Sequence, residues 1–362
     1  MAKKILIVSM KAGWGHIKAA QALEEYAKKN LPHLYVKHID LCVVEPLLGK
    51  FFQKFYDISS NRFPRVWGKV YEAFDKELVA IAFQKLSGAQ TLINHRVADY
   101  LKEQKADDII FTNVIAAPLI APVCRRIFPA GSLSVVVTDY HGHSYYNVPE
   151  LDRYFVAIPE VKDDLARVGV DEQKIAVTGI PVGLKFFTKP NVSLLRRRLG
   201  FKEARPTVLF VSRMRKDFVI PAITGLLLRE PKINLAVVCG GNDKLYRKIK
   251  EDIPRRPENF KLVNWTNRMD EYMKISDAVI SKPGGLIISE CLALGKPMIM
   301  TDPIPGQEEH NAEIMSRFGY GKLAVGAEEI IKAVDRSLSP AKPGLAAMTE
   351  EQNPASRILK YF

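Results

Sequence analysis

Short apolar runs rich in β-branched residues alternate with helical patterns along most of the chain, and this alternation restricts the fold more than any other feature. The predicted strands of the first half span 4–9, 35–40, 109–112, 134–138 and 154–157. Those of the second half span 207–212, 235–239, 261–264, 278–281 and 298–301. Helical patterns lie between them, such as 17–29, where Ala20, Leu23 and Ala27 share one face. Strands separated by helices predict parallel sheets covered by helices.

The chain is long enough to build two such sheets. Its 362 residues exceed the size at which a single hydrophobic core stops growing, so two domains are expected. The predicted break lies between Val182 and Pro206, an interval that holds Pro190 and the basic run 196–198. We therefore predict an α/β protein of two Rossmann-like domains facing across a cleft, over 1–185 and 186–340, followed by a C-terminal segment over 341–362.

Composition narrows the class of protein. Apolar residues make up 47% of the chain and charged residues 26%, as in ordinary folded domains. No run of about eighteen apolar residues occurs, so we expect no membrane-spanning helix. The apolar run that follows Lys3 and Lys4 is too short for a signal peptide, and we interpret it as the first strand.

Charge and cysteine usage indicate partners and compartment. The net charge of +13 implies an anionic partner, either nucleic acid or an acidic membrane surface, and no nucleic-acid-binding motif is evident. The cysteines are scattered and show no CxxC spacing, which predicts reduced thiols in a cytosolic protein rather than a disulfide or metal site. They are Cys42, Cys124, Cys239 and Cys291.

The segment 277–294 has the pattern of a buried strand, a Pro-Gly-Gly turn and a helix that Gly295 ends. Gly284 and Gly285 have no side chains, so a ligand can approach the backbone closely. The free N–H groups and the positive end of the helix dipole favour an anion. Glu290 lies one to two turns into the helix, where its carboxylate can accept hydrogen bonds from a ribose diol. A diphosphate beside a diol is half of a nucleotide-sugar, so this corner predicts a nucleotide-sugar site.

The pattern SKPGG-x(4)-E over 281–290, followed by PIPGQEE-x-N over 303–311, resembles the donor-binding signature of the family 28 glycosyltransferases. Among these it is most similar to the diacylglycerol glucosyltransferases and the monogalactosyldiacylglycerol synthases. The resemblance implies the two-domain GT-B architecture, in which the last helix, here 354–361, crosses back onto the first domain. It also implies a UDP-glucose or UDP-galactose donor, a diacylglycerol acceptor, transfer with inversion, and neither metal nor other cofactor.

The resemblance implies a role for each matching residue on the donor side. Gly284, Gly285 and Leu286 would hold the diphosphate, Glu290 the ribose, and uracil would rest near Met269. Gln307 and Glu308 match positions that reach the hydroxyls of the transferred sugar.

Relatives have a glycine-rich loop where this chain has 211–218, which contains no glycine. Arg213, Arg215 or Lys216 can supply charge to the phosphates instead. The alternative is a loop closed to the donor, which leaves weak activity or none.

The loop Ala12-Gly13-Trp14-Gly15-His16 resembles the glycine-rich loop of the diacylglycerol glycosyltransferases. We expect Gly13 and Gly15 to form a tight turn that places His16 near a helix start. A neutral imidazole there can remove the proton of an acceptor hydroxyl. The alternative is an N-cap histidine without a chemical role. Trp14 stands where the family usually has glycine.

The segment Thr138-Asp139-Tyr140-His141-Gly142-His143, with 151–157 and 177–182, resembles another series of family motifs. Asp139 at a strand end is expected to position the acceptor or orient the base, with His143 and Tyr146 on the acceptor side. Asp139 and the two histidines also form a possible metal cluster, although the resemblance implies a fold that works without bound metal. The family's Trp-x-His is Tyr146-x-Val148 here, and its Thr-Phe-Pro-Phe turn is replaced over 112–115.

Residues 50–71 interleave aromatic and basic side chains, among them Phe55 and Trp67. This mixture suits a segment that lies in a membrane interface, with rings at the headgroup level. The alternative is a helical pair with buried rings and a solvated basic face. We therefore expect a cytoplasmic protein attached peripherally to the inner face of the membrane.

Two alternatives to transfer onto diacylglycerol stay open. One is transfer of the sugar to another lipid or to a small molecule, and the other is binding of nucleotide-sugar or lipid without turnover.

Overall fold

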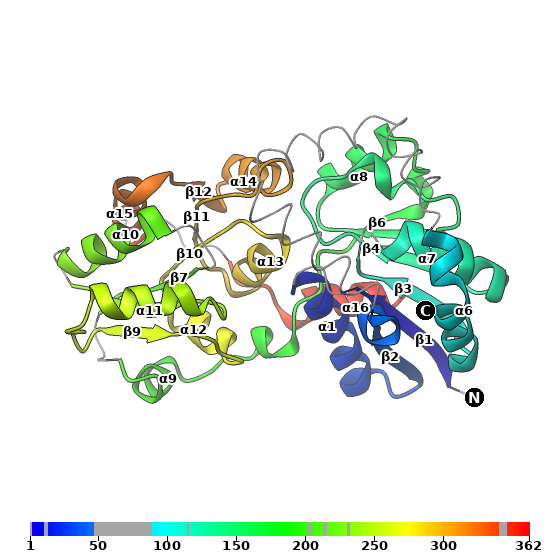
Figure 1. The fold of residues 1–362 in the computed structure, drawn as a ribbon, viewed down its shortest axis with the longest axis horizontal. Coiled ribbons are helices and arrows are strands. Elements are labelled where there is room, and N and C mark those ends of the chain that lie inside the picture. The colour runs from blue at the N-terminus through cyan, green and yellow to red at the C-terminus, as the bar shows by residue number, and fades with distance from the viewer. Residues whose placement is uncertain are drawn as a thin grey trace. The chain divides into compact units, whose positions relative to one another are not determined.

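The computed structural model describes residues 2–10, 14–46, 89–113, 116–201, 205–212, 216–229, 232–339 and 346–362. The chain divides into two compact units (Figure 1). The first comprises Met1–Leu184, Ile304–Asn311 and Glu350–Phe362. The second comprises Lys185–Pro303 and Ala312–Thr349.

The first unit contains a parallel sheet of six strands in the order β2-β1-β3-β4-β5-β6. All five strands predicted in this half of the chain are confirmed within one or two residues at their ends. The edge strand β6 was missed, because its three residues are too few to show a period. The bounds are β1 (Lys3–Ser9), β2 (Leu34–Asp40), β3 (Asp108–Phe111), β4 (Leu133–Val136), β5 (Arg153–Val156) and β6 (Ile175–Val177).

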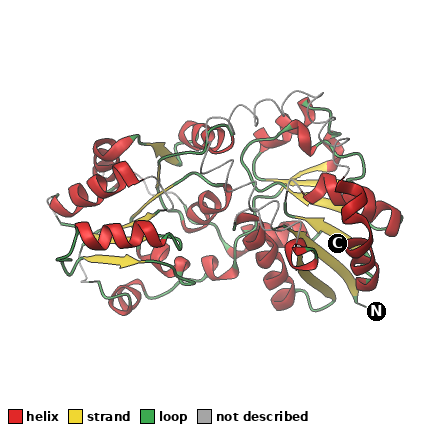
Figure 2. Ribbon diagram, in the orientation of Figure 1, coloured by secondary structure: helices red, strands yellow, loops and turns green. Residues whose placement is uncertain are grey.

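Helices cover both faces of this sheet (Figure 2). Successive side chains of a strand point to opposite faces. Ile5 and Ile7 of β1 therefore enter one core cluster, while Leu6 and Val8 enter the other. Burial on both faces explains why β1, β3 and β4 are mostly apolar. The helices are α1 (Gly15–Asn30), α2 (Leu41–Val44), α6 (Ala89–Gln104), α7 (Ala116–Ile127), α8 (Pro159–Arg167) and α16 (Pro354–Leu359).

The C-terminal helix α16 packs beside α1 (Figure 1). The Asn353 side chain caps it by accepting a hydrogen bond from the N–H of Ala355 at 2.9 Å. Ile358 is buried in the same core cluster as Leu23 of α1. The backbone of Gly179 comes so close that an added Cβ would lie 2.7 Å from Cγ of Pro354. A chain segment far away in the sequence thus completes the core of the first unit.

The second unit contains another parallel sheet of six strands, in the order β12-β11-β10-β7-β8-β9. The predicted strands are again confirmed, and the three-residue edge strand β12 was missed. The strands are β7 (Thr207–Val211), β8 (Asn234–Val238), β9 (Phe260–Val263), β10 (Ala278–Ser281), β11 (Met298–Met300) and β12 (Gly321–Leu323). The helices are α9 (Val192–Arg198), α10 (Lys216–Leu228), α11 (Asp243–Asp252), α12 (Met269–Ile275), α13 (Gly285–Leu294) and α15 (Gly326–Ser337). Helix α14 (Gln307–Arg317) is divided between the units: its residues up to Asn311 belong to the first unit and those from Ala312 onward to the second.

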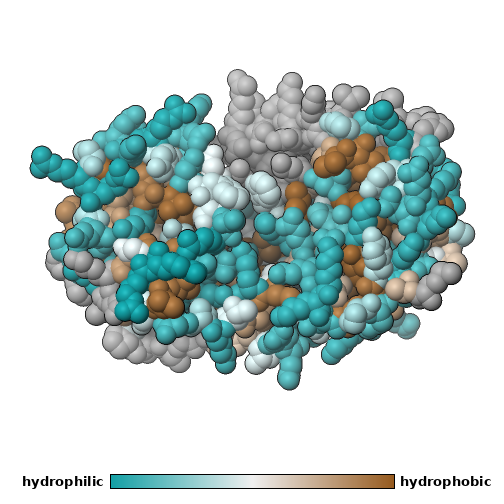
Figure 3. Space-filling model, turned by 90° about the horizontal axis from the view of Figure 1, so that it is seen from below, coloured by the Kyte–Doolittle hydropathy of each residue, from teal (hydrophilic) through white to brown (hydrophobic). Residues whose placement is uncertain are grey.

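No helix in the described part of the chain is long and apolar enough to cross a bilayer. Hydrophilic side chains cover most of the surface seen in Figure 3. Cys124, Cys239 and Cys291 are buried, and no disulfide joins the cysteines that the structure describes. Each unit is built around its own buried apolar core.

Candidate functional site

The predicted glycine corner is present at the carboxyl end of β10. Gly284 is the N-cap of α13, with φ −71° and ψ 146°, and no side chain caps this helix start. The first N–H groups of a helix have no partner within the helix, because the carbonyls that would accept from them precede it. An uncapped helix start made of two glycines therefore offers hydrogen-bond donors and partial positive charge to an anion.

A lysine stands next to this corner. Lys282 lies three residues before α13, and its Nζ is 3.4 Å from Oδ2 of Asp302 in the loop that follows β11. Asp302 has φ +46°, the left-handed conformation that aspartate tolerates better than most residues. Sequence reasoning did not assign a role to Lys282, although it lies inside the motif that drew attention to the corner.

Glu290 lies on α13, five residues after the first helical residue, and is half-buried. Gly284, Gly285, Leu286 and Glu290 thus belong to one β–α unit, as predicted. Met269 is the first residue of α12, the helix that follows β9. Arg213 lies outside the described residues.

The segment before α12 is held by a group of charged side chains. Lys185 Nζ donates to the carbonyl of Asn267 at 3.1 Å and pairs with Oδ1 of Asp270 at 2.9 Å. Buried Lys274 donates to Oγ1 of Thr188 at 2.8 Å and to the carbonyl of Lys185, and it lies 3.5 Å from Oδ2 of Asp270. These contacts tie residues 185–188 to α12. Sequence reasoning missed them because no motif marks them.

In the first unit, His16 is the second residue of α1. Its Nδ1 lies 2.8 Å from the carbonyl oxygen of Thr112 and 2.9 Å from Oγ1 of Thr138. A carbonyl oxygen can only accept, so Nδ1 carries the hydrogen and Nε2 keeps the lone pair of the neutral ring. The tautomer that a general base needs is therefore set by the backbone of Thr112.

The helix start differs from the predicted turn. Trp14 is the N-cap of α1, so His16 does not cap the helix. Gly15 is the first helical residue rather than part of a turn, because the backbone already has helical angles at Trp14, with φ −87° and ψ −21°. Gly13 lies outside the described residues. The side chain of Trp14 is 47% exposed, so this replacement of a glycine leaves the ring at the surface.

Asp139 is buried in the loop after β4 and receives its hydrogen bonds from side-chain amides. Gln307 Nε2 lies 2.9 Å from Oδ1 and 2.8 Å from Oδ2, and Asn311 also donates to the carboxylate. Burial raises the pKa of Asp139, whereas Gln307, the charge of His16 and Asn311 oppose the rise. Burial lowers the pKa of His16, opposed by Asp139 and by the bond to Thr112. Burial thus opposes charge on both side chains, whereas the amides of Gln307 and Asn311 favour the ionised form of Asp139.

The side chains after Asp139 fill space within the first unit. His141 Nδ1 lies 3.1 Å from Oδ2 of Asp164, and its ring stacks on His310 with centroids 4.2 Å apart. His143 is buried, with its ring stacked on that of Tyr145 at 4.4 Å.

Tyr146 and Val148 are buried in one core cluster, and burial raises the pKa of the Tyr146 hydroxyl well above its usual range. No cluster able to hold a metal ion occurs among the residues that the structure describes. Because Tyr146 and Val148 lie in this core, their difference from the family's Trp-x-His changes the packing of the core.

The structure brings His16, Asp139 and Gln307 together within the first unit. Gln307, which was expected to reach sugar hydroxyls, donates from its amide nitrogen to Asp139 in this structure. The Glu308 carboxylate accepts from the N–H of Ile304 at 2.7 Å. Asn311 belongs to the same motif but was assigned no role, and only the fold shows its contact with Asp139. Phe55 and Trp67 lie outside the described residues.

Comparison with solved structures establishes the fold. Over 99% of its length the chain is similar to UDP-GlcNAc 2-epimerase from Neisseria meningitidis bound to UDP-GlcNAc, with a TM-score of 0.62, 14% identity and 99% of that chain covered. It is similar over 99% of its length to Anabaena HepE in complex with UDP and glucose, with a TM-score of 0.53, 15% identity and 94% of that chain covered. Identities this low establish the fold alone. The fold is the two-domain Rossmann-like architecture known as GT-B.

Sequence comparison then gives the family. Residues 16–182 match the protein family described as monogalactosyldiacylglycerol (MGDG) synthase. Residues 217–361 match the family described as the glycosyltransferase family 28 C-terminal domain. The processive diacylglycerol beta-glucosyltransferase of Staphylococcus carnosus (strain TM300) is 31% identical over 354 residues, which cover 96% of this chain and 88% of that protein. The chain belongs to the family 28 glycosyltransferases, in the group of the diacylglycerol glucosyltransferases.

Proposed function

We propose that the protein is an inverting glycosyltransferase that moves a hexose from UDP-glucose or UDP-galactose to the free hydroxyl of diacylglycerol. The observation that carries the proposal is the uncapped Gly284–Gly285 helix start with Glu290 on the following turns of the same helix. The name of the Staphylococcus carnosus relative, a diacylglycerol beta-glucosyltransferase, supports the acceptor and favours glucose as the sugar.

The second unit would bind the donor. The N–H groups at the start of α13 would bind the diphosphate, Glu290 the ribose diol, and the backbone near Met269 the uracil. As the bond between the sugar and UDP breaks, negative charge grows on the diphosphate. Preorganised N–H groups stabilise that charge most where it develops. Lys282, three residues before α13, would add a positive charge on the same loop. We expect no metal or organic cofactor, so a chelator should leave the rate unchanged.

The first unit would supply the base. The acceptor oxygen attacks the anomeric carbon while its proton passes to Nε2 of His16, whose lone pair follows from the bond between Nδ1 and Thr112. The bond from the anomeric carbon to UDP breaks with its electron pair, and UDP leaves. Attack from the opposite side inverts the centre, so an α-linked donor yields a β-glycoside. The carboxylate of Asp139 offsets the positive charge that His16 acquires.

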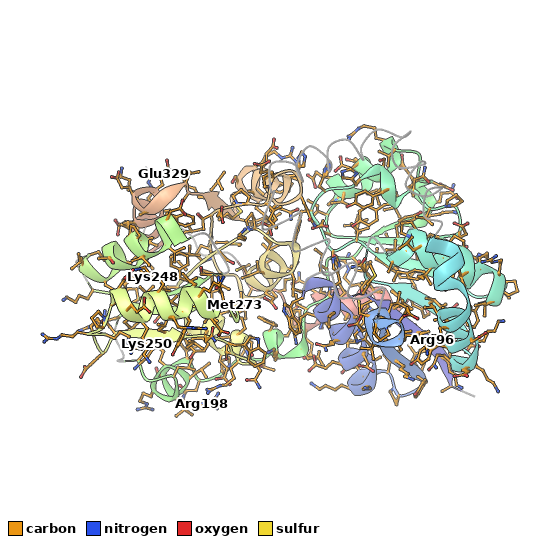
Figure 4. The ribbon with its side chains drawn as sticks, viewed as in Figure 1. Arg96, Arg198, Lys248, Lys250, Met273 and Glu329 are labelled. Carbon is orange, nitrogen blue, oxygen red and sulfur yellow. The ribbon has the colours of Figure 1, made fainter. Side chains whose placement is uncertain are left out.

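The charge distribution suits an anionic membrane surface. The net charge is +13, and exposed basic side chains lie on α9 and α11 of the second unit. Arg198, Lys248 and Lys250, which are labelled in Figure 4, belong to this exposed set. Each basic side chain near an anionic bilayer contributes about 1 kcal/mol of attraction. We therefore propose that the protein works at the inner surface of the membrane, where diacylglycerol resides.

Product mass spectrometry tests the proposal. Purified protein is incubated with vesicles of phosphatidylcholine, phosphatidylglycerol and diacylglycerol, together with UDP-glucose, UDP-galactose or UDP-N-acetylglucosamine. A product heavier than diacylglycerol by one hexose, with a β-linkage by NMR, supports it, and a ladder of hexose additions would reveal repeated transfer. A glycoside formed only on another lipid or on a soluble alcohol would show that diacylglycerol is not the acceptor. Folded protein that binds UDP but forms no glycoside would exclude catalysis.

A further inference from the structure

Residues 304–311 lie against the loop that follows β4, within the first unit. Three successive contacts join them. Gln307 donates to Asp139, Asn311 accepts from the N–H of Tyr140 at 2.9 Å, and His310 stacks on His141. Residues 139–141 of this loop are therefore each held by a segment that is distant in the sequence.

Asn311 is fully buried, and the two ends of its amide have different tasks. Its oxygen accepts from the backbone N–H of Tyr140, which identifies that end as Oδ1. The nitrogen end is then left to donate to the Asp139 carboxylate, with which the side chain is hydrogen-bonded. Asn311 thus holds the backbone next to Asp139 and also donates one of the hydrogen bonds that the carboxylate accepts.

Other titratable groups around Asp139 supply little fixed charge. Among the described residues, those that interact with it electrostatically are His16, His141 and Tyr146. His141 is bound to Asp164, which also accepts from Arg167 at 3.0 Å. None of the three is a lysine or an arginine. The neutral amides of Gln307 and Asn311 are consequently the groups that satisfy the carboxylate.

We propose that Asn311 is a positioning residue, which keeps Asp139 ionised and oriented so that the carboxylate can balance the charge His16 gains on accepting the acceptor proton. This inference rests on the proposed function and extends it to a residue that touches neither donor nor acceptor. A buried carboxylate without hydrogen-bond donors takes up a proton, because burial penalises its charged form. A neutral Asp139 would leave the imidazolium of His16 unsupported.

Two variants separate the tasks of Asn311. Asn311→Asp keeps the acceptor for Tyr140 but replaces the donor facing Asp139 with a second acid. Asn311→Leu removes both. The control is Asn353→Ala, which deletes another fully buried asparagine of the first unit, one whose side-chain oxygen caps α16. Circular dichroism establishes that each variant is folded, and Asn311→Asp carries the test should Asn311→Leu not fold.

The main readout is the pH dependence of kcat/KM with UDP-glucose and diacylglycerol vesicles. The free enzyme is active when Asp139 is ionised and His16 is neutral. The acid limb of the kcat/KM profile therefore reports the pKa at which this pair loses its last proton. Both Asn311 variants should move this limb upward by about one to two pH units and lower kcat at neutral pH roughly tenfold or more. Asn353→Ala should leave the limb in place.

A second readout needs no activity. Carbon-13 NMR of the labelled Asp139 carboxyl follows its titration directly, and the resonance is assigned with Asp139→Asn. The midpoint should rise in both Asn311 variants and stay unchanged in Asn353→Ala. An unmoved midpoint, or a fall in rate with an unmoved acid limb, would overturn the role of Asn311. Should the wild-type protein transfer no sugar, the proposed function fails by itself, and this titration still decides whether Asn311 governs Asp139.

Discussion

Nδ1 of His16 lies 2.8 Å from the carbonyl oxygen of Thr112, which directly follows β3. The sheet places them together, because β1 leads into α1 and pairs with β3, with Val8 opposite Phe111. The chain leaves β1 toward β2 on one side and returns as β3 on the other. Such a reversal of strand order is where open α/β sheets bind their ligands. His16 therefore stands at the reversal point, with its base nitrogen set by a backbone carbonyl.

Replacing His16 with alanine should remove the base and spare donor binding. We expect kcat to fall by about a hundredfold or more, while the Kd for UDP, measured by calorimetry, stays within about twofold. His33→Ala is the matched control, because this exposed histidine belongs to the same unit. Equal losses of UDP binding and rate in His16→Ala would contradict the assignment.

Replacing Glu290 with alanine should have the opposite signature. Loss of a carboxylate that accepts from the ribose diol should weaken UDP binding by roughly tenfold, the magnitude of one charge-assisted hydrogen bond. Glu313→Ala, an exposed change on α14, serves as the control. Calorimetry with UDP measures both, and unchanged binding in Glu290→Ala would remove Glu290 from the donor site.

Gly179→Ala should loosen the C-terminal helix. Gly179 has φ +91°, and its added Cβ would lie 2.7 Å from Cγ of Pro354. Gly319 also has a positive φ, but a Cβ added there would meet nothing within 4 Å. Gly319→Ala should therefore cost about 1 kcal/mol from backbone strain alone, and Gly179→Ala about 2–3 kcal/mol. Urea unfolding measures both, and equal losses would show that the contact with Pro354 is unimportant.

Lys274→Met should destabilise the second unit. The change removes a buried ammonium that binds the carbonyl of Lys185 and the hydroxyl of Thr188, and it leaves Asp270 with Lys185 as its partner. Removing one member of a buried charged group costs about 3 kcal/mol. Exposed Lys322→Met should cost less than about 0.5 kcal/mol. Denaturant unfolding distinguishes them, and a loss below about 1 kcal/mol for Lys274→Met would argue against the network.

Asp164 should make stability depend on pH in acid. Partial burial raises the pKa of Asp164, but hydrogen bonds from His141, the N–H of Gly142 and Arg167 lower it to about 2, below its ordinary 3.8. The unfolded chain binds a proton there first, so the stabilisation is complete above about pH 4 and is lost as the pH falls toward about 2. Urea unfolding measures the free energy of unfolding between about pH 6 and pH 2. The loss of this free energy on acidification should be smaller in Asp164→Asn by roughly 1–2 kcal/mol. Parallel curves for the two proteins would contradict it.

Local patterns in the sequence were enough to predict most of the strands and the glycine corner. Strands β1, β3, β4, β8 and β10 have mostly apolar runs because both their faces are buried. The edge strands β6 and β12 are only three residues long, and their existence depends on a neighbour that offers a partner. Gly284, Gly285 and Glu290 are within seven residues of one another, so a single β–α unit sets their arrangement.

Contacts between distant residues could not be inferred in the same way. The sequence by itself determined the two parallel sheets, the family resemblance and the anion-binding corner, because each depends on periodicity or on neighbouring residues. Only the tertiary structure decided the tautomer of His16 and the partners of Asp139. Thr112 and Asn311 are 96 and 172 residues from the groups they bind, His16 and Asp139, and no local pattern specifies which amide a buried acid will meet. Burial in a low-dielectric core then makes those few hydrogen bonds decisive for charge.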